Sequence, residues 1–271
     1  MPYYVKKYPD IISQESRDKI SKRYKRITKL INNEFWNTES ETCNSFYVGS
    51  YGRNTAISTS DIDILIVLPD KEFDEYNNLS GNSQSRLLQA VKDPIKLSYP
   101  NSDVRADGQV IKINFSDGIK FEILPAFRNY SGTYIYPDSN LGGKWMSTNP
   151  KKEQKAMKQK NKESNGLLVS TCRHLRYIRD NFYKSYHLPG IVIDSFVYHA
   201  IGNWKYCEEG TSSANPGDYE KKLLNYFNEN KALWSILPLL PLKAPGSLDE
   251  IEVSDSSIDC LEKILNCMAK Q

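Results

Sequence analysis

Residues 48–69 read VGSYGRNTAISTSDIDILIVLP and set two carboxylates, Asp61 and Asp63, inside an apolar run. Side chains in an extended strand alternate between its faces, so both aspartates point one way while Ile62 and Ile64 point to the core. Like charges side by side repel each other, and a buried carboxylate without a partner is costly. The pair therefore either caps a local structure or holds a cation.

A third acid follows on a later strand. Residues 110–115 (VIKINF) and 119–125 (IKFEILP) are alternating runs joined by Ser-Asp-Gly, a pattern typical of a β-hairpin. The apolar side chains of the second run share one face, which leaves Glu122 on the other. Three carboxylates on neighbouring strands are what a two-metal phosphoryl-transfer site requires, and Mg²⁺ prefers such oxygen ligands.

The pair Gly49-Ser50 precedes Asp61 and supplies groups that suit a phosphate. Glycine lets the backbone turn closely against a ligand, and serine donates both its hydroxyl and its amide. If the following residues, GRNTAI, begin a helix or a turn, their backbone N–H groups add to an anion site. Gly-Ser, Asp-x-Asp and a later acid together predict a metal site beside a bound triphosphate.

Size and composition exclude several classes of protein. The 271 residues suffice for one large domain or two lobes, and no apolar run has the length of a membrane span. The N-terminus lacks the apolar segment of a signal peptide, and the five cysteines form no CxxC pair. We therefore expect a cytoplasmic protein without a zinc site. A net charge of +3 does not by itself indicate a nucleic-acid binder, although basic residues crowd 151–163 and 173–184.

Hydrophobic periodicity predicts a mixed α/β half followed by a helical half. In the first half we expect a long amphipathic helix at 12–36, strands at 45–49 and 62–68, a helix at 83–94 that Pro94 ends, the hairpin, and a loop-rich 128–149 with a short strand at 133–136. From Pro150 we expect helices near 150–163, 166–184, 190–206, 217–230 and 255–269, with an irregular segment at 236–248.

The motifs resemble those of a known family. GSYGRNTAISTSDIDILIVLP is similar to the signature of DNA polymerase β-type nucleotidyltransferases. Together with DGIKFEILPAF, KWMSTNP, NGLLVSTCRHLRYIR and SFVYHA, in that order, it resembles the bacterial CD-NTases over roughly residues 45–200. These are relatives of cyclic GMP-AMP synthase and 2′-5′ oligoadenylate synthase that act in anti-phage signalling.

The resemblance implies an α+β fold: a polymerase β-like nucleotidyltransferase core, with a mixed β-sheet and flanking helices, at 1–150, and a helical C-terminal lobe at 151–271 that completes the nucleotide pocket. It implies the following roles: Asp61, Asp63 and Glu122 as catalytic metal ligands, and Gly49, Ser50, Arg176, Ser195 and Phe196 as nucleotide-binding residues. Arg173 or Arg179 is an alternative to Arg176. Glu122 stands where the family usually has aspartate, whose carboxylate lies one methylene closer to the backbone.

The resemblance further implies an enzyme, a nucleotidyltransferase that uses two Mg²⁺ ions, with Mn²⁺ as an alternative. Its substrates would be ATP, GTP or pyrimidine nucleoside triphosphates, and its product a cyclic di- or trinucleotide released with pyrophosphate. The product would reach a downstream effector, with no membrane and no required nucleic acid. Two alternatives stay open: a template-independent transferase that makes linear oligonucleotides, and an inactive relative that only binds nucleotides.

Overall fold

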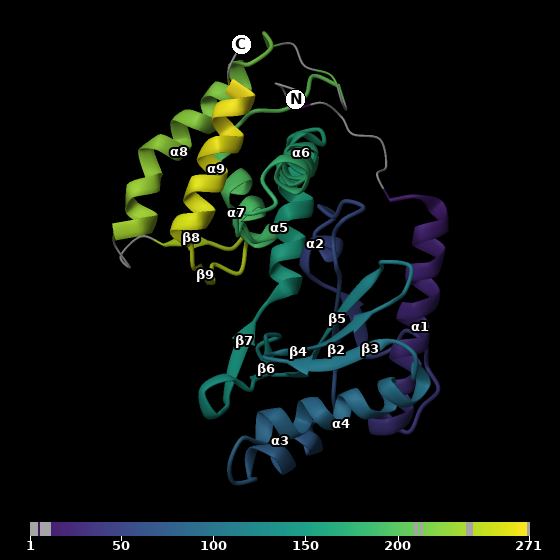
Figure 1. Cartoon of the computed structure of the whole chain (residues 1–271). Helices are drawn as coiled ribbons and strands as arrows, with labels where there is room; N and C mark the ends of the chain where they lie inside the picture. The colour runs from purple at the N-terminus through teal and green to yellow at the C-terminus, as the bar shows by residue number, and fades with distance from the viewer. Residues whose placement is uncertain (1–4, 6–11, 209–210, 212–213, 237–240, 270–271) are drawn as a thin grey trace. The chain divides into compact units, whose positions relative to one another are not determined.

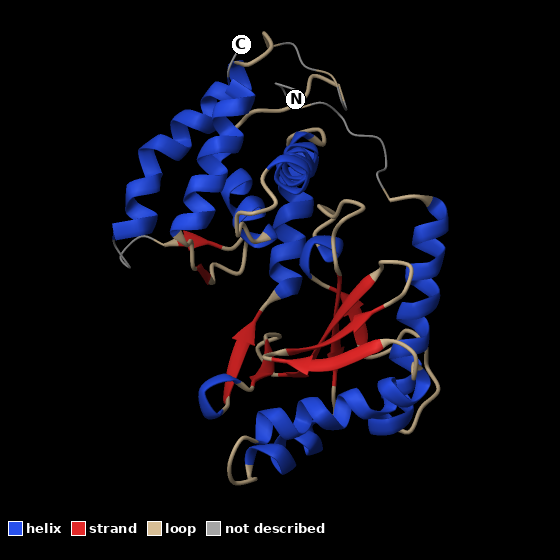
Figure 2. Cartoon of the chain, viewed as in Figure 1, coloured by secondary structure: helices blue, strands red, loops and turns tan. Residues whose placement is uncertain are grey.

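The structure is a computed structural model that describes Val5 and residues 12–208, 211, 214–236 and 241–269 (Figures 1 and 2). Its backbone contacts divide the chain into two compact units. The sheet unit comprises residues 12–52 and 60–149. The helical unit comprises Val5, the short segment 53–59 and the described residues from 150 onward.

The sheet unit is built on one mixed β-sheet, which Figure 2 shows in red. Its strands are β1 (Ser45–Tyr47), β2 (Ile62–Val67), β3 (Asp103–Asp107), β4 (Val110–Asn114), β5 (Lys120–Arg128), β6 (Tyr134–Asp138) and β7 (Lys144–Thr148). The order is β1-β2-β5-β4-β3, with β6 paired to both β5 and β7. Only β2 and β5 run parallel; the other pairs of this sheet are antiparallel.

Helices cover the apolar face of this sheet. The helices of the sheet unit are α1 (Gln14–Trp36), α2 (Gly49–Gly52), α3 (Asp70–Asn77), α4 (Ser83–Ser98) and the 3₁₀ turn η1 (Asn140–Gly142), of which α2 lies instead on the face that carries Asp63. Helices α1 and α4 contact each other and the sheet (Figure 1). Helix α1 buries Ile20, Ile27 and Ile31, which recur at helical spacing, and β2 buries Ile62 and Ile64. The opposite face carries Asp63 and Glu122 and, further along the same two strands, a smaller buried apolar cluster that includes Leu65 and Ala126.

The helical unit consists of five helices in the described residues: α5 (Pro150–Glu163), α6 (Leu167–Phe182), α7 (Gly190–Ala200), α8 (Asp218–Ile236) and α9 (Asp255–Ala269). Two short strands, β8 (Leu242–Lys243) and β9 (Glu250–Ile251), pair antiparallel. A single apolar core joins the helices, with Leu175, Val192, Phe196, Phe227 and Leu261 fully buried. No helix in the described part of the chain is long and apolar enough to cross a membrane.

These observations confirm the α+β class and the main elements, with corrections. Helix α4 continues through Pro94 to Ser98, so the proline does not end it. Proline removes one backbone donor, but Val91 and Ile95 on either side of it stay buried and hold the helix in place. Helix α3 and strands β3 and β7 were not predicted. In the segment 236–248, predicted to be irregular, residues 237–240 lie outside the described residues, and the remainder contributes β8.

The division of the chain is close to the predicted boundary but adds a segment to it. The main part of the helical unit begins at Pro150. The unit also includes Val5 and residues 53–59, which lie between α2 and β2 in the sequence. Ordinary patterning gives no sign that this segment belongs with residues so much later in the chain. The functional domains 1–150 and 151–271 stay a prediction.

Candidate active site

The three predicted acids lie on one face of the sheet. Strands β2 and β5 run parallel in a register that places Asp63 directly beside Glu122. Asp61 immediately precedes β2, while Ile62 and Ile64 are buried at 2% and 0% exposure. Neighbouring strands are about 4.8 Å apart, so the backbones that carry Asp63 and Glu122 are one strand spacing apart. The predicted arrangement of faces is confirmed.

Gly49 lies directly against Asp63. The Val48 amide donates a hydrogen bond to the Asp63 carbonyl at 2.9 Å, and the chain then turns at Gly49 with φ of +56°. A Cβ atom on Gly49 would stand 1.8 Å from Asp63 Oδ2, a distance no side chain tolerates. Ser50 follows within α2, a single turn that begins at Gly49.

A lysine stands beside the third acid. Lys112 on β4 is the cross-strand partner of Glu122, and its Nζ lies 3.5 Å from Glu122 Oε1. The same ammonium lies 2.7 Å from Asp107 Oδ2, and this hydrogen bond raises the pKa of Lys112 and lowers that of Asp107. Lys112 is therefore a cation throughout the neutral range and partly neutralises Glu122.

The donor set suits a divalent cation. Asp61, Asp63 and Glu122 offer only carboxylate oxygens, the ligands that Mg²⁺ and Mn²⁺ prefer, and Mg²⁺ usually needs one or two of them together with substrate phosphates. Among the residues that the structure describes, no three His, Cys, Asp or Glu side chains already converge as a ready-made metal site. The residues fit the group that the sequence predicts, with substrate phosphate as a further ligand.

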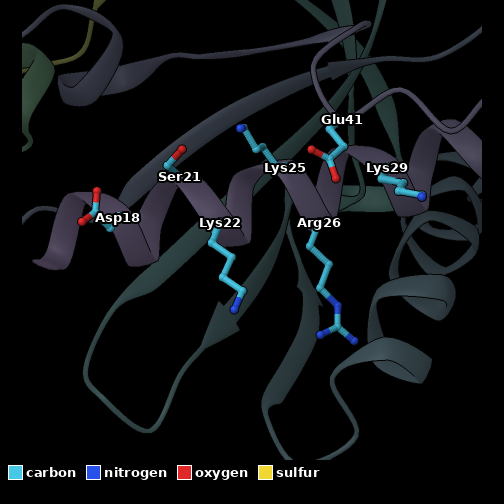
Figure 3. Close-up of a pocket in the computed structure, with 7 residues that line it drawn as sticks. All are labelled: Asp18, Ser21, Lys22, Lys25, Arg26, Lys29 and Glu41. Carbon is cyan, nitrogen blue, oxygen red and sulfur yellow. The ribbon is translucent and has the colours of Figure 1, made fainter.

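Two cavities of the sheet unit differ sharply in their lining. The larger, about 490 Å³, runs along the exposed side of α1 (Figure 3). Its lining is Asp18, Ser21, Lys22, Lys25, Arg26, Lys29 and Glu41, none of which is a predicted site residue. The smaller, about 240 Å³, is lined by Asp61, Arg105, Lys112, Asn114, Lys120, Phe121 and Glu122. Of the two, only the smaller includes predicted metal ligands.

Arg176, predicted to contact phosphate, is 1% exposed within the helical unit. Its guanidinium donates to Asp194 at 2.5 Å and 2.9 Å and to the Gly190 carbonyl at 2.9 Å. These bonds occupy the guanidinium inside the protein, so the geometry gives Arg176 a structural role and does not support the predicted phosphate contact. Of the alternatives, Arg179 donates to Asp180 and the Leu188 carbonyl.

Asp194 is the centre of a buried ionic network that the sequence pattern does not predict. Arg53 donates to Asp194 and Glu153, both at 2.8 Å, and Thr55 donates to Asp194 at 2.9 Å. Burial by itself raises the pKa of Asp194, but Arg176 and Arg53 together hold it below its ordinary value. The network ties segment 53–59 to α5, α6 and α7. One acid in the otherwise apolar IVIDSFV was the available signal.

Ser195 and Phe196 are fully buried in the helical unit. The Ser195 Oγ has no hydrogen-bond partner among the described residues. The Phe196 ring packs against Tyr226, Phe227 and Trp234, as a core residue does. Neither side chain faces solvent, and their nucleotide contacts stay predictions.

Comparison with known proteins identifies the family of this chain. Residues 10–161 match the family described as the Second Messenger Oligonucleotide or Dinucleotide Synthetase domain, SMODS. A cyclic AMP-AMP-AMP synthase of an Acinetobacter strain is 24% identical over 223 residues, which cover 80% of this chain. The match spans 60% of that relative's length.

Solved structures share the fold. The Elizabethkingia meningoseptica CdnE cyclic dinucleotide synthase, solved with GTP and Apcpp, superposes with a TM-score of 0.65 at 16% identity, covering 95% of this chain and 91% of that one. The STING-associated CdnE c-di-GMP synthase of Capnocytophaga granulosa gives 0.64 at 17% identity, with 93% and 80% covered. The chain belongs to the SMODS family and is a bacterial CD-NTase with the nucleotidyltransferase fold.

Proposed function

We propose that this protein is a metal-dependent nucleotidyltransferase that joins nucleoside triphosphates into a cyclic di- or trinucleotide and releases pyrophosphate. One observation carries the proposal: Asp63 and Glu122 stand side by side on parallel strands, with Asp61 on the same face. The contact of Gly49 with Asp63 supports it, because it brings a turn of bare backbone to the acids.

Each nucleotidyl transfer forms one bond and breaks one. The oxygen of an acceptor ribose hydroxyl bonds to the α-phosphorus of the donor, and the bond from that phosphorus to the leaving pyrophosphate breaks. Asp61, Asp63 and Glu122 would hold the divalent cations. When bound, these ions lower the pKa of the attacking hydroxyl and neutralise charge on the leaving group.

Residues of the chain bind and orient the two nucleotides and accept the proton. Gly49 and Ser50 hold the donor triphosphate next to Asp63, because the missing side chain at Gly49 lets phosphate approach the backbone. The Glu122 carboxylate lies on β5, next to β4. It takes the proton of the attacking ribose hydroxyl, directly or through water. Holding the two nucleotides in line supplies most of the acceleration. A second transfer within the linear intermediate closes the ring.

The proposal includes the biological role of the product. Membership of a second-messenger synthetase family supports a diffusible cyclic nucleotide that acts on a downstream effector in CBASS-type anti-phage defence. The choice of bases is left to the experiment, since the relatives named above make different products.

The test is to incubate the purified protein with all four radiolabelled nucleoside triphosphates and Mg²⁺ or Mn²⁺, followed by phosphatase and mass spectrometry. A phosphatase-resistant product without a free end is expected, and its mass names the bases. Linear products would replace the proposal with an oligoadenylate synthase-like activity. No product with either metal, together with nucleotide binding by calorimetry, would favour an inactive nucleotide-binding relative.

A further inference from the structure

The first residues of segment 53–59 are bonded to buried carboxylates of the helical unit. Arg53 donates to Glu153 on α5 and to Asp194 on α7, each at 2.8 Å, and Thr55 donates to Asp194 at 2.9 Å. The side chains of Arg53 and Asp194 are only 8% and 0% exposed, so water hardly screens their attraction. These ion pairs therefore fix the beginning of the segment on α5 and α7.

The segment has further contacts with α6. Arg173 donates to the backbone carbonyl of Asn54 at 3.1 Å and to its side-chain oxygen at 3.0 Å. At the other end of the segment, the Thr59 hydroxyl donates to the Asp180 carboxylate at 2.5 Å. Both ends are thus anchored on the same unit, the first by buried ion pairs and the second by an exposed hydrogen bond.

The neighbours of this segment in the chain are residues of the proposed active site. Gly52, the last residue of α2, directly precedes Arg53. Only Ser60 separates Thr59 from Asp61. The chain that joins the proposed phosphate turn to the first proposed metal ligand therefore consists almost entirely of the anchored segment.

Helix α2 is too short to keep its geometry without support from the residues around it. It is a single turn, in which the Gly52 amide donates to the Val48 carbonyl at 2.8 Å. The first turn of a helix costs more backbone entropy than its hydrogen bond returns. Before the end of the turn, the Tyr51 ring packs against Tyr47 with the ring centroids 4.7 Å apart. After the end of the turn, the next residue is Arg53, which the buried carboxylates hold.

We infer that Arg53 is a positioning residue for nucleotidyl transfer. Its bonds to Asp194 and Glu153 hold the residue that follows α2, and so fix how the Gly49–Ser50 turn presents its backbone to the donor triphosphate. Thr59 gives weaker support to the same segment just before Asp61. This inference rests on the proposed function. In this role Arg53 acts through α2 and does not touch the nucleotide.

The test uses variants that remove an anchor with little change in charge or volume. Arg53→Lys keeps the positive charge, but an ammonium lacks the planar fork with which Arg53 bonds two carboxylates. Thr59→Val removes the hydroxyl, and its matched control, Thr59→Ser, keeps it. Ile264→Val is the control for stability, because it weakens the buried core of the helical unit on α9 without changing the segment.

Two measurements are made on each protein, at a temperature at which circular dichroism shows it folded. Turnover with nucleoside triphosphates and Mg²⁺ or Mn²⁺ gives kcat and KM separately. Hydrogen exchange of the Gly52 amide, followed by nuclear magnetic resonance, reports on α2 without reference to activity, since an amide in a short turn exchanges by local opening.

We expect Arg53→Lys to lower kcat at saturating substrate by about tenfold, because even a small misplacement of reacting groups is costly. The Gly52 amide of this variant should exchange faster than in the wild type. Thr59→Val should lower kcat by about threefold, as expected for one exposed hydrogen bond, and Thr59→Ser should restore it. Ile264→Val should lower Tm and leave both kcat and the exchange of Gly52 unchanged.

An Arg53→Lys enzyme with wild-type kcat and wild-type exchange at Gly52 would overturn the positioning role and leave the proposed function intact. Where Arg53→Lys does not fold, equal kcat in Thr59→Val and Thr59→Ser would overturn the support that the segment gives. A wild type that makes no product would overturn the proposed function. The exchange of Gly52 would then decide by itself whether Arg53 holds α2.

Discussion

Gly49 and Asp63 are in such close contact that the turn leaves no space for a single methyl group at residue 49. A Cβ there would lie 1.8 Å from Asp63 Oδ2 and 2.9 Å from its Cβ. The positive φ of +56° independently favours glycine. One backbone position thus fixes both the path of the proposed phosphate loop and the orientation of a proposed metal ligand.

Gly49→Ala should therefore displace the Asp63 carboxylate. We expect a loss of kcat of about 100-fold, since misplacement of a reacting group by about 1 Å costs this much. The control is Gly81→Ala, where φ is +79° and no atom lies within 4 Å of the added Cβ. Both variants carry a backbone strain of about 1–2 kcal/mol, which thermal unfolding measures. Equal activity in the Gly49→Ala and Gly81→Ala enzymes would mean that Gly49 has no role in the active site.

Asp61→Asn with Asp63→Asn should abolish turnover and leave the fold intact. Removal of two like charges that face the same side relieves repulsion, so we expect an unchanged or slightly raised Tm without metal. Product formation and circular dichroism on the same sample provide the two readouts. The control, Asp74→Asn with Glu75→Gln, neutralises two exposed acids on α3 and should keep full activity. If the Asp61→Asn/Asp63→Asn protein unfolds, the aspartates serve the fold and not a metal.

Lys112→Gln should strengthen binding of a divalent cation to the nucleotide-free protein. The Lys112 ammonium lies 3.5 Å from Glu122 Oε1 and competes for that carboxylate. Both side chains are about one-third exposed, so the gain should be modest, about two- to fivefold in Mn²⁺ affinity. Titration with Mn²⁺ followed by electron paramagnetic resonance measures the affinity. Lys71→Gln on α3, where the lysine is 74% exposed, is the control. An equal or lower affinity in the Lys112→Gln protein would argue against Glu122 as a ligand.

The acids of the site were predictable because the signal for them is local. Alternation with buried isoleucines and a hairpin turn fixes which way Asp61, Asp63 and Glu122 point, whatever the rest of the chain does. The pairing of Lys112 with Glu122 was also predictable, since both residues lie five positions from Asp117 at the centre of the hairpin turn. Strand β3 was missed because its outward residues are charged at a sheet edge, where no apolar alternation is needed.

The network of Asp194 was beyond local prediction. Arg53 and Asp194 are 141 residues apart, and nothing near Arg53 indicates that its partners lie on α5 and α7. The same limit explains why Arg176 was assigned to phosphate. A basic residue on a helix has the same sequence pattern whether it faces solvent or a buried carboxylate, and only the packing of α6 against α7 distinguishes the two.

Asp194 should make the stability of the helical unit depend on pH in acid. Burial raises the pKa of this carboxyl, but Arg176 and Arg53 outweigh burial and hold it below the ordinary 3.8. A carboxyl with a lowered pKa stabilises the fold fully above its unfolded value and loses that contribution as the pH falls through the folded value. Glu153, whose pKa burial raises, has the opposite trend, so the wild type alone does not isolate Asp194.

The comparison of wild type with Asp194→Asn isolates it. The variant leaves the buried Arg176 guanidinium without a carboxylate and Arg53 with Glu153 alone, which should cost about 3–5 kcal/mol of unfolding free energy at neutral pH. Urea unfolding between about pH 3 and pH 7 measures the difference in unfolding free energy between the wild type and the variant. This difference should be largest above about pH 5 and should shrink below about pH 4, because the wild type loses the same charge there. Where the Asp194→Asn protein does not fold, Thr55→Val removes a single hydrogen bond to Asp194. The difference in unfolding free energy between the wild type and Thr55→Val should then be smaller, with the same dependence on pH. Parallel curves over the whole range would mean that Asp194 stays ionised even at the acid end, so that its two arginines hold its pKa below the range of the experiment.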